Sequence, residues 1–301
     1  MNRCTLCPRE CGVDRIDGQL GYCRTDASLP ISSICCHMGE EPVLSGSQGI
    51  CNVFFAHCNL QCIFCQNHQI SSNQGSLNSV DMSIEEAVGQ IETILKGGAH
   101  GVGFVSPSHC LTQMRAIMTA LNNRGWNPTF VYNTNGYDRL QTIRSLEGVI
   151  DVYLPDMKYM DNELAHRYSG ATDYVGVATK ALNEMYRQKG AAIELDNDGY
   201  ITSGLIIRHL VLPGHVENSI EVLRFIAEEL SVDVHISLMA QYHPTAAVRG
   251  HEQLHRCLGV QEYNRVIDEF EVLGFYRGWV QDLSSSAHYL PDFDNHHPFE
   301  E

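Results

Sequence analysis

Three cysteines, Cys58, Cys62 and Cys65, follow the apolar run 51–55 in a C-x-x-x-C-x-x-C spacing. A short loop with three thiolates can wrap around a common centre, and iron–sulfur clusters are held by such thiolates. A cubane cluster has one iron more than this loop has cysteines, so one iron would lack a protein ligand. Structural zinc is the alternative, but zinc sites usually close with four ligands, and no fourth ligand lies nearby with knuckle spacing. The spacing therefore favours a [4Fe-4S] cluster with an open iron over zinc or buried thiols.

A second group of cysteines lies near the N-terminus, where Cys4, Cys7, Cys11 and Cys23 have the spacing C-x2-C-x3-C-x11-C. Proline and glycine residues between them supply the tight turns of a small metal-wrapped module. Four unliganded thiols are a weaker interpretation, because so short a segment has little core of its own. Four thiolates suit structural zinc or a fully ligated iron–sulfur cluster. We expect a metal-binding module over 1–45, with zinc favoured and a second cluster as the alternative.

The remaining cysteines have simpler explanations. Cys35 and Cys36 are adjacent, and their side chains would diverge in extended backbone. We expect packing rather than an extra metal ligand at this pair. Cys51, Cys110 and Cys257 are expected to be buried small hydrophobic residues.

Composition excludes several classes of protein. Disulfide scaffolds are short and secreted, whereas this chain has 301 residues, twelve cysteines and no apolar signal-peptide stretch at its N-terminus. No apolar run is long enough to cross a bilayer. We therefore expect a cytoplasmic protein with reduced cysteines, in an anaerobic or low-oxygen host because an exposed cluster reacts with oxygen. The net charge of -16 argues against a nucleic-acid partner, since phosphate binding needs clustered Lys and Arg.

Apolar strand-like segments alternate with segments of helical spacing from residue 49 onward. Strands are predicted at 50–56, 101–105, 129–132, 149–154, 205–212 and 232–238. Helices are predicted at 84–96, 111–121, 137–146, 162–168, 174–188 and 262–273. A further helix is predicted after Pro213-Gly214, with Ile220, Leu223, Ala227 and Leu230 on one face. Ser83 and Glu86 form a capping-box pattern at the start of the first of these helices, and Gly97 ends it. Such alternation indicates parallel βαβ units and predicts a partial (β/α)6 barrel over 46–245. A C-terminal helix and tail would occupy 246–301, with 284–301 on the surface or disordered.

The predicted strands end in polar residues, and in β/α barrels chemistry collects at the carboxyl ends of the strands. The polar ends are Ser106-Pro107-Ser108-His109, Asn133-Thr134-Asn135-Gly136, Asp156-Met157-Lys158, Arg208-His209 with Leu212-Pro213-Gly214-His215, and Gln241-Tyr242-His243. We expect all of these strand ends, and Cys58, to face one opening at the carboxyl end of the barrel.

These motifs together resemble the radical S-adenosylmethionine (radical SAM) superfamily, in the branch related to the pyruvate formate-lyase activating enzyme. The matching segments are Cys65-Gln66-Asn67, the Asn-Thr-Asn-Gly-Tyr run at 133–137, Asp156-Met157-Lys158, Arg208 with Leu212-Pro213-Gly214, and Tyr242-His243. The resemblance implies that the amino and carboxylate groups of S-adenosylmethionine bind the open iron. One electron from the cluster then splits the sulfonium, which gives methionine and a 5′-deoxyadenosyl radical.

The resemblance also implies cofactor-binding roles. Lys158 would hold the carboxylate of S-adenosylmethionine, and Asp156 would bind its ribose, a cation or a substrate amide. Phe64 and His243 would lie at the adenine, and Arg208 would contact the cofactor or form a buried ion pair inside the barrel. The sequence singles out no catalytic side chain.

The chain departs from the family pattern at two of these positions. Asn133 replaces an aspartate of the activating enzymes, which removes a charge. Ser106-Pro107-Ser108-His109 replaces the usual Gly-Gly-Glu. The backbone oxygens of Ser106 and Pro107 could still accept from the cofactor's amino group.

Several functions are consistent with these features. The chain could activate a glycyl radical enzyme, modify another protein, or act on a small molecule, with reduced flavodoxin or ferredoxin as the electron donor expected from the resemblance. A non-catalytic iron–sulfur electron-transfer protein is an alternative of another class. A zinc-dependent hydrolase is disfavoured, because no H-E-x-x-H or comparable motif appears.

Overall fold

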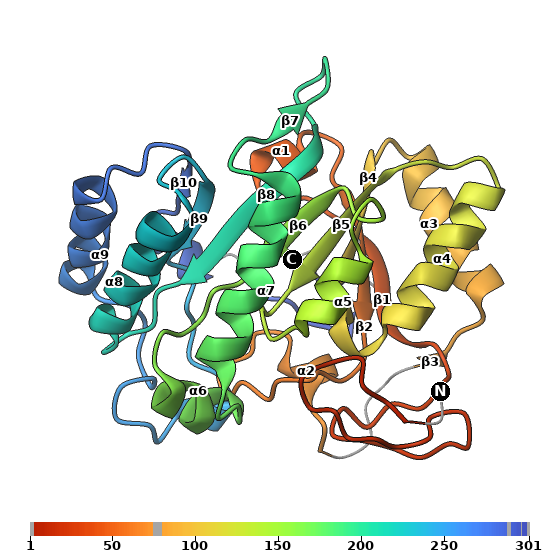
Figure 1. Cartoon of the computed structure of the whole chain (residues 1–301), viewed down its shortest axis with the longest axis horizontal. Coiled ribbons are helices and arrows are strands. Elements are labelled where there is room, and N and C mark those ends of the chain that lie inside the picture. Colours follow the sequence, from red (N-terminus) through yellow and green to blue (C-terminus); the bar gives the residue numbers. More distant parts are fainter. Residues whose placement is uncertain (1–2, 75–79, 288–289, 296, 300–301) are drawn as a thin grey trace.

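The computed structural model describes residues 3–74, 80–287, 290–295 and 297–299. Six parallel strands lie side by side at the centre of the sheet in the order β9-β8-β6-β5-β4-β2 (Figure 1). They are β2 (Ile50–Phe55), β4 (Gly101–Val105), β5 (Thr129–Thr134), β6 (Val152–Pro155), β8 (Ile201–Leu210) and β9 (His235–Met239). Each corresponds to a strand predicted from the sequence, so the partial (β/α)6 barrel is confirmed.

The sheet extends beyond the predicted strands at both edges. β1 (Pro30–His37) pairs antiparallel with β2, and β3 (Val80–Asp81) pairs antiparallel with β1. β10 (Gly278–Val280) runs parallel to β9 at the other edge, and β7 (Glu194–Leu195) pairs antiparallel with β8. The strand predicted at 50–56 is therefore not the first of the chain, as its place in the predicted order implied. In β1, serines and cysteines interrupt the alternation of apolar and polar residues that marks a strand.

The helices follow the predicted order with small shifts at their ends. They are α1 (Pro42–Ser45), α2 (His68–Ser71), α3 (Ile84–Lys96), α4 (Leu111–Asn123), α5 (Leu140–Ser145), α6 (Asn162–Ser169), α7 (Tyr174–Lys189), α8 (Val216–Phe225) and α9 (Val260–Val272). The capping box of α3 is confirmed: Ser83 Oγ accepts from the Glu86 amide at 3.2 Å, and the Glu86 carboxylate accepts from the Ser83 amide at 2.9 Å. α8 continues as a π-helical turn, Ile226–Leu230. The short helices α1 and α2 were not predicted. None of the helices in the described ranges is long and apolar enough to span a bilayer.

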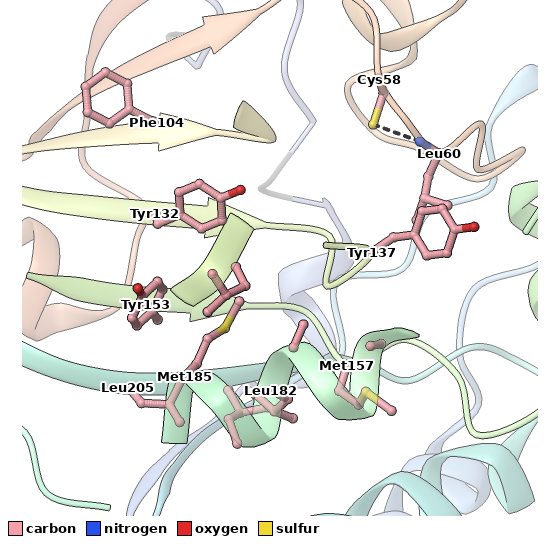
Figure 2. Packing of buried hydrophobic residues seen from close by; sticks show 14 of the residues in the cluster. Cys58, Leu60, Phe104, Tyr132, Tyr137, Tyr153, Met157, Leu182, Met185 and Leu205 are labelled. Carbon is pink, nitrogen blue, oxygen red and sulfur yellow. Dashed lines mark hydrogen bonds between the residues drawn. The ribbon is translucent and has the colours of Figure 1, made fainter. Parts of the chain in front are cut away.

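The main hydrophobic core lies between the sheet and the helices that cover its outer face. Figure 2 shows Tyr132 of β5, Tyr153 of β6 and Leu205 of β8 near Leu182 and Met185 of α7. All five side chains are buried. Burying large side chains of this kind stabilises the fold by roughly 1.5–3 kcal/mol each.

A second, smaller apolar cluster fills the concave side of the sheet near the amino ends of its strands. Leu44 of the short helix α1 is fully buried in this cluster. Its other buried members are Ile50, Val131, Val152, Leu154, Ile201 and Ile206. In Figure 1, α1 lies at the end of the sheet opposite to α2. The helix therefore closes the interior from one end and leaves the carboxyl ends of the strands open.

The N-terminal segment lies against the carboxyl ends of the strands (red in Figure 1). Residues 3–29 form neither helix nor strand. The guanidinium of Arg9 donates to the Asn59 carbonyl oxygen at 2.9 Å, next to the first cysteine of the loop 58–65. Arg15 donates to the His109 carbonyl oxygen at 2.6 Å. This cysteine-rich segment is thus attached to the barrel beside the cysteine loop.

The C-terminal tail crosses the same end of the barrel. Residues Leu283–Ala287 form a 3-10 turn. Farther on, the rings of Phe293 and Phe299 lie 5.2 Å and 5.7 Å from the ring of Phe54 on β2. The described part of the tail therefore lies on the barrel surface, one of the two outcomes expected for 284–301.

Candidate functional site

One cavity of about 400 Å³ opens at the carboxyl ends of the parallel strands. Its walls come from the cysteine loop, the ends of all six parallel strands, the turn between β1 and α1, and the C-terminal tail. Of the residues predicted for the site, it is lined by Cys58, Cys62, Phe64, Cys65, Ser106, Asn133, Asp156, Lys158 and Arg208. A cavity of this size suits a small-molecule cofactor or substrate.

Cys58 begins the loop and is buried. Its sulfur accepts from the Leu60 amide at 3.4 Å (Figure 2) and from the Asn135 side-chain amide at 3.3 Å. Burial raises the pKa of this thiol to about 12. A buried thiolate is therefore unfavourable unless a bound cation compensates its charge.

The other two loop cysteines also accept hydrogen bonds from neighbouring side chains. Ser169 donates to Cys62 Sγ at 3.0 Å, and Ser71 donates to Cys65 Sγ at 3.3 Å. Burial raises the pKa of Cys62 to about 11, although nearby Lys158 acts in the opposite direction. Donors aimed at sulfur are the contacts that orient and tune thiolates bound to iron. The donor set thus fits an iron–sulfur cluster.

Two asparagines hold the loop against the end of β5. Asn59 is fully buried and donates to the Tyr137 carbonyl oxygen at 2.8 Å. Asn135 donates to Asn59 Oδ1 at 2.8 Å as well as to Cys58. Asn135 was predicted at a polar strand end, but its contact with the cysteine loop was not predicted.

Lys158 and Asp156 form an ion pair at the end of β6. Lys158 Nζ lies 2.5 Å from Asp156 Oδ2, and both side chains are largely shielded from solvent. Burial acts to lower the pKa of Lys158, but the charges of Asp156 and Cys62 outweigh it and raise that pKa above its ordinary value. The ion pair therefore favours the charged ammonium, which lies close to the cysteine loop, where it could bind a carboxylate.

Arg208 of β8 forms the buried ion pair that the sequence analysis left as an alternative. Its Nε donates to Glu41 Oε1 at 2.8 Å and its Nη2 to Glu41 Oε2 at 2.5 Å. Nη2 also donates to Glu40. Burial acts to raise the pKa of Glu40, but Arg208 outweighs it and holds the pKa at about 2. Both glutamates line the cavity and were not predicted as site residues.

Phe64, Ser106 and Asn133 also face the cavity. The Phe64 ring lies 6.1 Å from the ring of Tyr242, which is buried behind it. Ser106 has a left-handed backbone with a φ of 51°, and its amide donates to the Asn133 carbonyl oxygen at 2.8 Å. A non-glycine residue in this conformation is uncommon, and such residues concentrate at functional sites.

Four histidines at the strand ends do not line the cavity, so the expectation that every polar end faces one mouth was too broad. His109 is buried and bonded to the Ala56 carbonyl oxygen at 2.9 Å, and burial lowers its pKa to about 4. His209 lies between a backbone carbonyl oxygen and Ser219. His215 pairs with a tyrosine hydroxyl, and His243 follows the buried Tyr242. The role of His243 at an adenine stays a prediction.

The four N-terminal cysteines are gathered in one segment outside the cavity. Cys4, Cys7 and Cys23 are buried, and Cys11 is partly exposed. Burial raises the pKa of Cys7 to about 12, and the charges of the other three add to this effect.

Within the described residues, no three or more His, Cys, Asp or Glu side chains are grouped to hold one metal ion. The thiolates of a zinc site all lie about 2.3 Å from one ion. Cluster thiolates, in contrast, each bind a different iron. The metal at the N-terminal group stays a prediction.

The remaining cysteines largely follow expectation. Cys35 is buried against Phe54, and its neighbour Cys36 is exposed, as side chains that diverge from a strand should be. Cys51 and Cys110 are buried. Cys257 is exposed, so the prediction of burial was wrong there; it lies in the loop between β9 and α9 and not on a core-facing element.

Three cavity residues gave no signal that could be recognised in the sequence. His37 lies at the end of β1, which was itself missed, and Pro291 and Phe299 belong to a tail without periodicity. The run Glu40-Glu41-Pro42 is conspicuous in the sequence, but its partner Arg208 is more than 160 residues away.

Comparison with known proteins agrees with this architecture. No protein-family model matches the chain. An uncharacterized protein of Methanocaldococcus jannaschii, MJ0674, is 28% identical over 269 residues, which cover 88% of this chain and 73% of that protein.

Solved structures of radical SAM enzymes share the fold. The FeFe-hydrogenase maturase HydG from Carboxydothermus hydrogenoformans matches with a TM-score of 0.53 and 13% identity, over 76% of this chain and 52% of that one. Streptococcus suis SuiB bound to its precursor peptide SuiA matches with a TM-score of 0.51 and 13% identity, over 78% of this chain and 49% of that one. The chain thus spans about half the length of these two structures. It has the fold of radical S-adenosylmethionine enzymes.

Proposed function

We propose that this protein is a radical SAM enzyme that binds a [4Fe-4S] cluster through Cys58, Cys62 and Cys65. The observation that carries the proposal is that all three cysteines line one cavity at the carboxyl ends of the strands and each accepts a hydrogen bond at sulfur. When bound together, the cluster and S-adenosylmethionine supply a one-electron cleavage that yields a 5′-deoxyadenosyl radical.

The side chains around the cysteine loop have distinct tasks in this proposal. Lys158 offers a fixed positive charge to the carboxylate of S-adenosylmethionine, and Asp156 holds the ammonium in place at 2.5 Å. Phe64 presents an apolar ring to the adenine. Ser106, which lines the cavity, offers its backbone carbonyl oxygen to the amino group, whereas the Pro107 carbonyl oxygen already accepts from the Cys110 amide at 2.8 Å. The apolar and aromatic walls exclude water, which protects a reactive radical from side reactions.

Anaerobic reconstitution tests the proposal directly. The protein is loaded with iron and sulfide, reduced with dithionite and given S-adenosylmethionine, and 5′-deoxyadenosine is measured. We expect 5′-deoxyadenosine from the wild type and none from Cys62→Ala. A fully reduced, cluster-loaded wild type that makes no 5′-deoxyadenosine and does not bind S-adenosylmethionine contradicts the proposal and favours a plain electron-transfer protein.

The proposal extends to the reaction class and surroundings. We infer hydrogen abstraction of the activating-enzyme type, from a glycyl radical enzyme or another protein, with a small molecule as the alternative substrate. Support for a protein substrate comes from the motifs at 65–67, 133–137 and 156–158 and from the peptide bound to the similar SuiB. Reduced flavodoxin or ferredoxin in a low-oxygen cytoplasm would supply the electron.

The protein substrate has its own test. Loop peptides of several glycyl radical enzymes are added to the reduced protein, and a rise in 5′-deoxyadenosine together with a peptide radical is expected. If none of the peptides raises 5′-deoxyadenosine or acquires a radical, a small-molecule substrate is favoured.

The N-terminal group completes the proposal. We infer that Cys4, Cys7, Cys11 and Cys23 hold zinc or a second cluster. Support comes from their spacing and from the burial of three of the four. Metal analysis of a Cys4→Ser/Cys7→Ser variant distinguishes the two, since either zinc or iron should fall relative to the wild type.

A further inference from the structure

The end of the cavity next to α1 has a polar floor, made by residues to which the proposed cofactor site gives no task. α1 fills the barrel below it with apolar side chains, and Glu40 and Glu41 lie directly before that helix. Glu41 is buried and Glu40 is largely shielded from solvent, and both bond to the guanidinium of Arg208. Asn52 donates to the free oxygen of Glu40 at 2.7 Å. The floor is therefore a fixed network.

This network holds one negative charge more than it holds positive charges. Glu41 accepts through both oxygens from the same guanidinium, which is the geometry of an ionised carboxylate. Glu40 accepts from that guanidinium and from a neutral amide. One arginine thus serves two carboxylates, while Lys158 is already matched by Asp156. A buried, uncompensated carboxylate is costly and favours a bound cation.

A second observation at the same place points to a ligand. His37 lines the cavity, is only 8% exposed, and its Nδ1 has no hydrogen-bond partner among the described residues. A buried ring nitrogen without a partner is rare in folded proteins, because its desolvation is not offset. With the ring proton on Nε2, Nδ1 is an acceptor, and a ligand that donates an N–H bond would satisfy it.

Two aromatic side chains line the same cavity as this floor. Trp279 packs against the apolar cluster around α1 and lines the cavity, and Phe299 lies 4.0 Å from the His37 ring. The faces of aromatic rings attract organic cations, tryptophan most strongly. Surplus negative charge, an unpaired ring nitrogen and aromatic rings all favour the binding of a positively charged organic group.

We propose that the floor formed by His37, Glu40, Glu41 and Arg208 is a substrate subsite for an organic cation, either a primary ammonium or a guanidinium group. The group belongs to a small amine or to a basic side chain of a peptide. The inference rests on the proposed function, because a radical formed at the cysteine loop would act on the molecule held at this floor.

Calorimetric titration of the reconstituted protein tests the subsite. The probes are butylammonium and methylguanidinium, with butanol and methylurea as neutral counterparts of similar shape. A lysine-containing tetrapeptide and its norleucine counterpart distinguish a peptide side chain from a small amine. We expect each favoured cation to bind at least about tenfold more tightly than its neutral counterpart.

Three variants locate the effect. Glu41→Gln removes the surplus charge and should abolish the preference for the cation. His37→Phe keeps the ion pairs and removes the acceptor, so it should weaken cation binding about tenfold even where Glu41→Gln fails to fold. Glu85→Gln removes an exposed carboxylate on α3 and should leave the preference unchanged.

Formation of 5′-deoxyadenosine, measured in parallel, separates this subsite from the proposed function. A wild type that makes 5′-deoxyadenosine but binds cation and neutral counterpart equally overturns the subsite alone. The subsite is likewise overturned if well-folded Glu41→Gln and His37→Phe both bind the cation like the wild type.

Discussion

The two cysteine groups of this chain are close in sequence but lie in different surroundings. The loop with Cys58, Cys62 and Cys65 ends strand β2 and opens onto the cavity. The cysteines at 4–23 lie in an irregular segment that packs on the outside of that loop and does not line the cavity. The difference teaches that access to a cavity, and not the number of thiolates, separates a candidate reaction centre from a candidate structural site.

The supporting contacts differ in the same way. Side chains from the end of β5, from α6 and from α2 donate to the sulfurs of the loop. The N-terminal segment is attached through Arg9 and Arg15, which donate to backbone oxygens of the barrel. Substitutions in the cysteine loop should therefore affect the chemistry. Substitutions among the N-terminal cysteines should affect the stability of the segment that packs on the barrel.

The largest effect is expected from Cys62→Ala. Removal of one of three thiolates should abolish the cavity cluster and with it the formation of 5′-deoxyadenosine. Iron and sulfide analysis and the product assay measure both. Cys257→Ala is the matched control, because that cysteine is exposed and outside the cavity, and it should behave like the wild type. If Cys62→Ala still cleaves S-adenosylmethionine, the cysteine loop is not the reaction centre.

A smaller effect is expected from the double variant Cys4→Ser/Cys7→Ser. It should lose the metal of the N-terminal group and become less stable, since metal-binding energy contributes to folding. Denaturant unfolding under anaerobic conditions measures the loss. The cavity cluster should remain, as judged by iron content. If iron at the cavity disappears as well, the two groups do not form independent sites.

Next comes Lys158→Met, which keeps the length of the side chain and removes its charge. The cluster should form normally, but binding of S-adenosylmethionine should weaken about 10- to 100-fold, equal to about 1.4–2.8 kcal/mol. Equilibrium dialysis gives the dissociation constant. Lys180→Met, on the exposed side of α7, provides the control and should bind as the wild type does. Equal affinities in the two variants would remove Lys158 from the cofactor site.

The smallest effect is expected from Ser169→Ala. Its hydroxyl donates to Cys62 at 3.0 Å, and such a bond stabilises the reduced, more negative cluster. The loss of about 1 kcal/mol should lower the reduction potential by roughly 40 mV in a one-electron couple. Potentiometric titration measures the shift. Ser145→Ala, an exposed serine on α5, should leave the potential unchanged. An upward shift in Ser169→Ala would show that this hydroxyl does not donate to the cluster ligand.

Much of the fold was predictable because the signals for it are local. The strand Gly101–Val105 is a short apolar run bounded by turn residues, and Ser83 and Glu86 mark the start of α3. Such patterns depend only on neighbouring residues. β1 was missed because the serines and cysteines of this strand disrupt the alternation.

The site was predictable only in part, for a related reason. The cysteine spacing and the strand ends mark Cys58, Lys158 and Asp156 directly. The roles of Glu40 and Glu41 depend on Arg208, which the barrel brings to them from far along the chain. A contact across the fold leaves no mark in a local pattern.

The central claim is that the cavity holds a cluster with one iron open to S-adenosylmethionine. Electron paramagnetic resonance of the reduced, reconstituted protein tests it most directly. We predict a signal of a reduced [4Fe-4S] cluster that changes when S-adenosylmethionine is added and is absent from Cys62→Ala. A signal that S-adenosylmethionine leaves unchanged, or zinc bound at the loop in place of iron, would contradict the account.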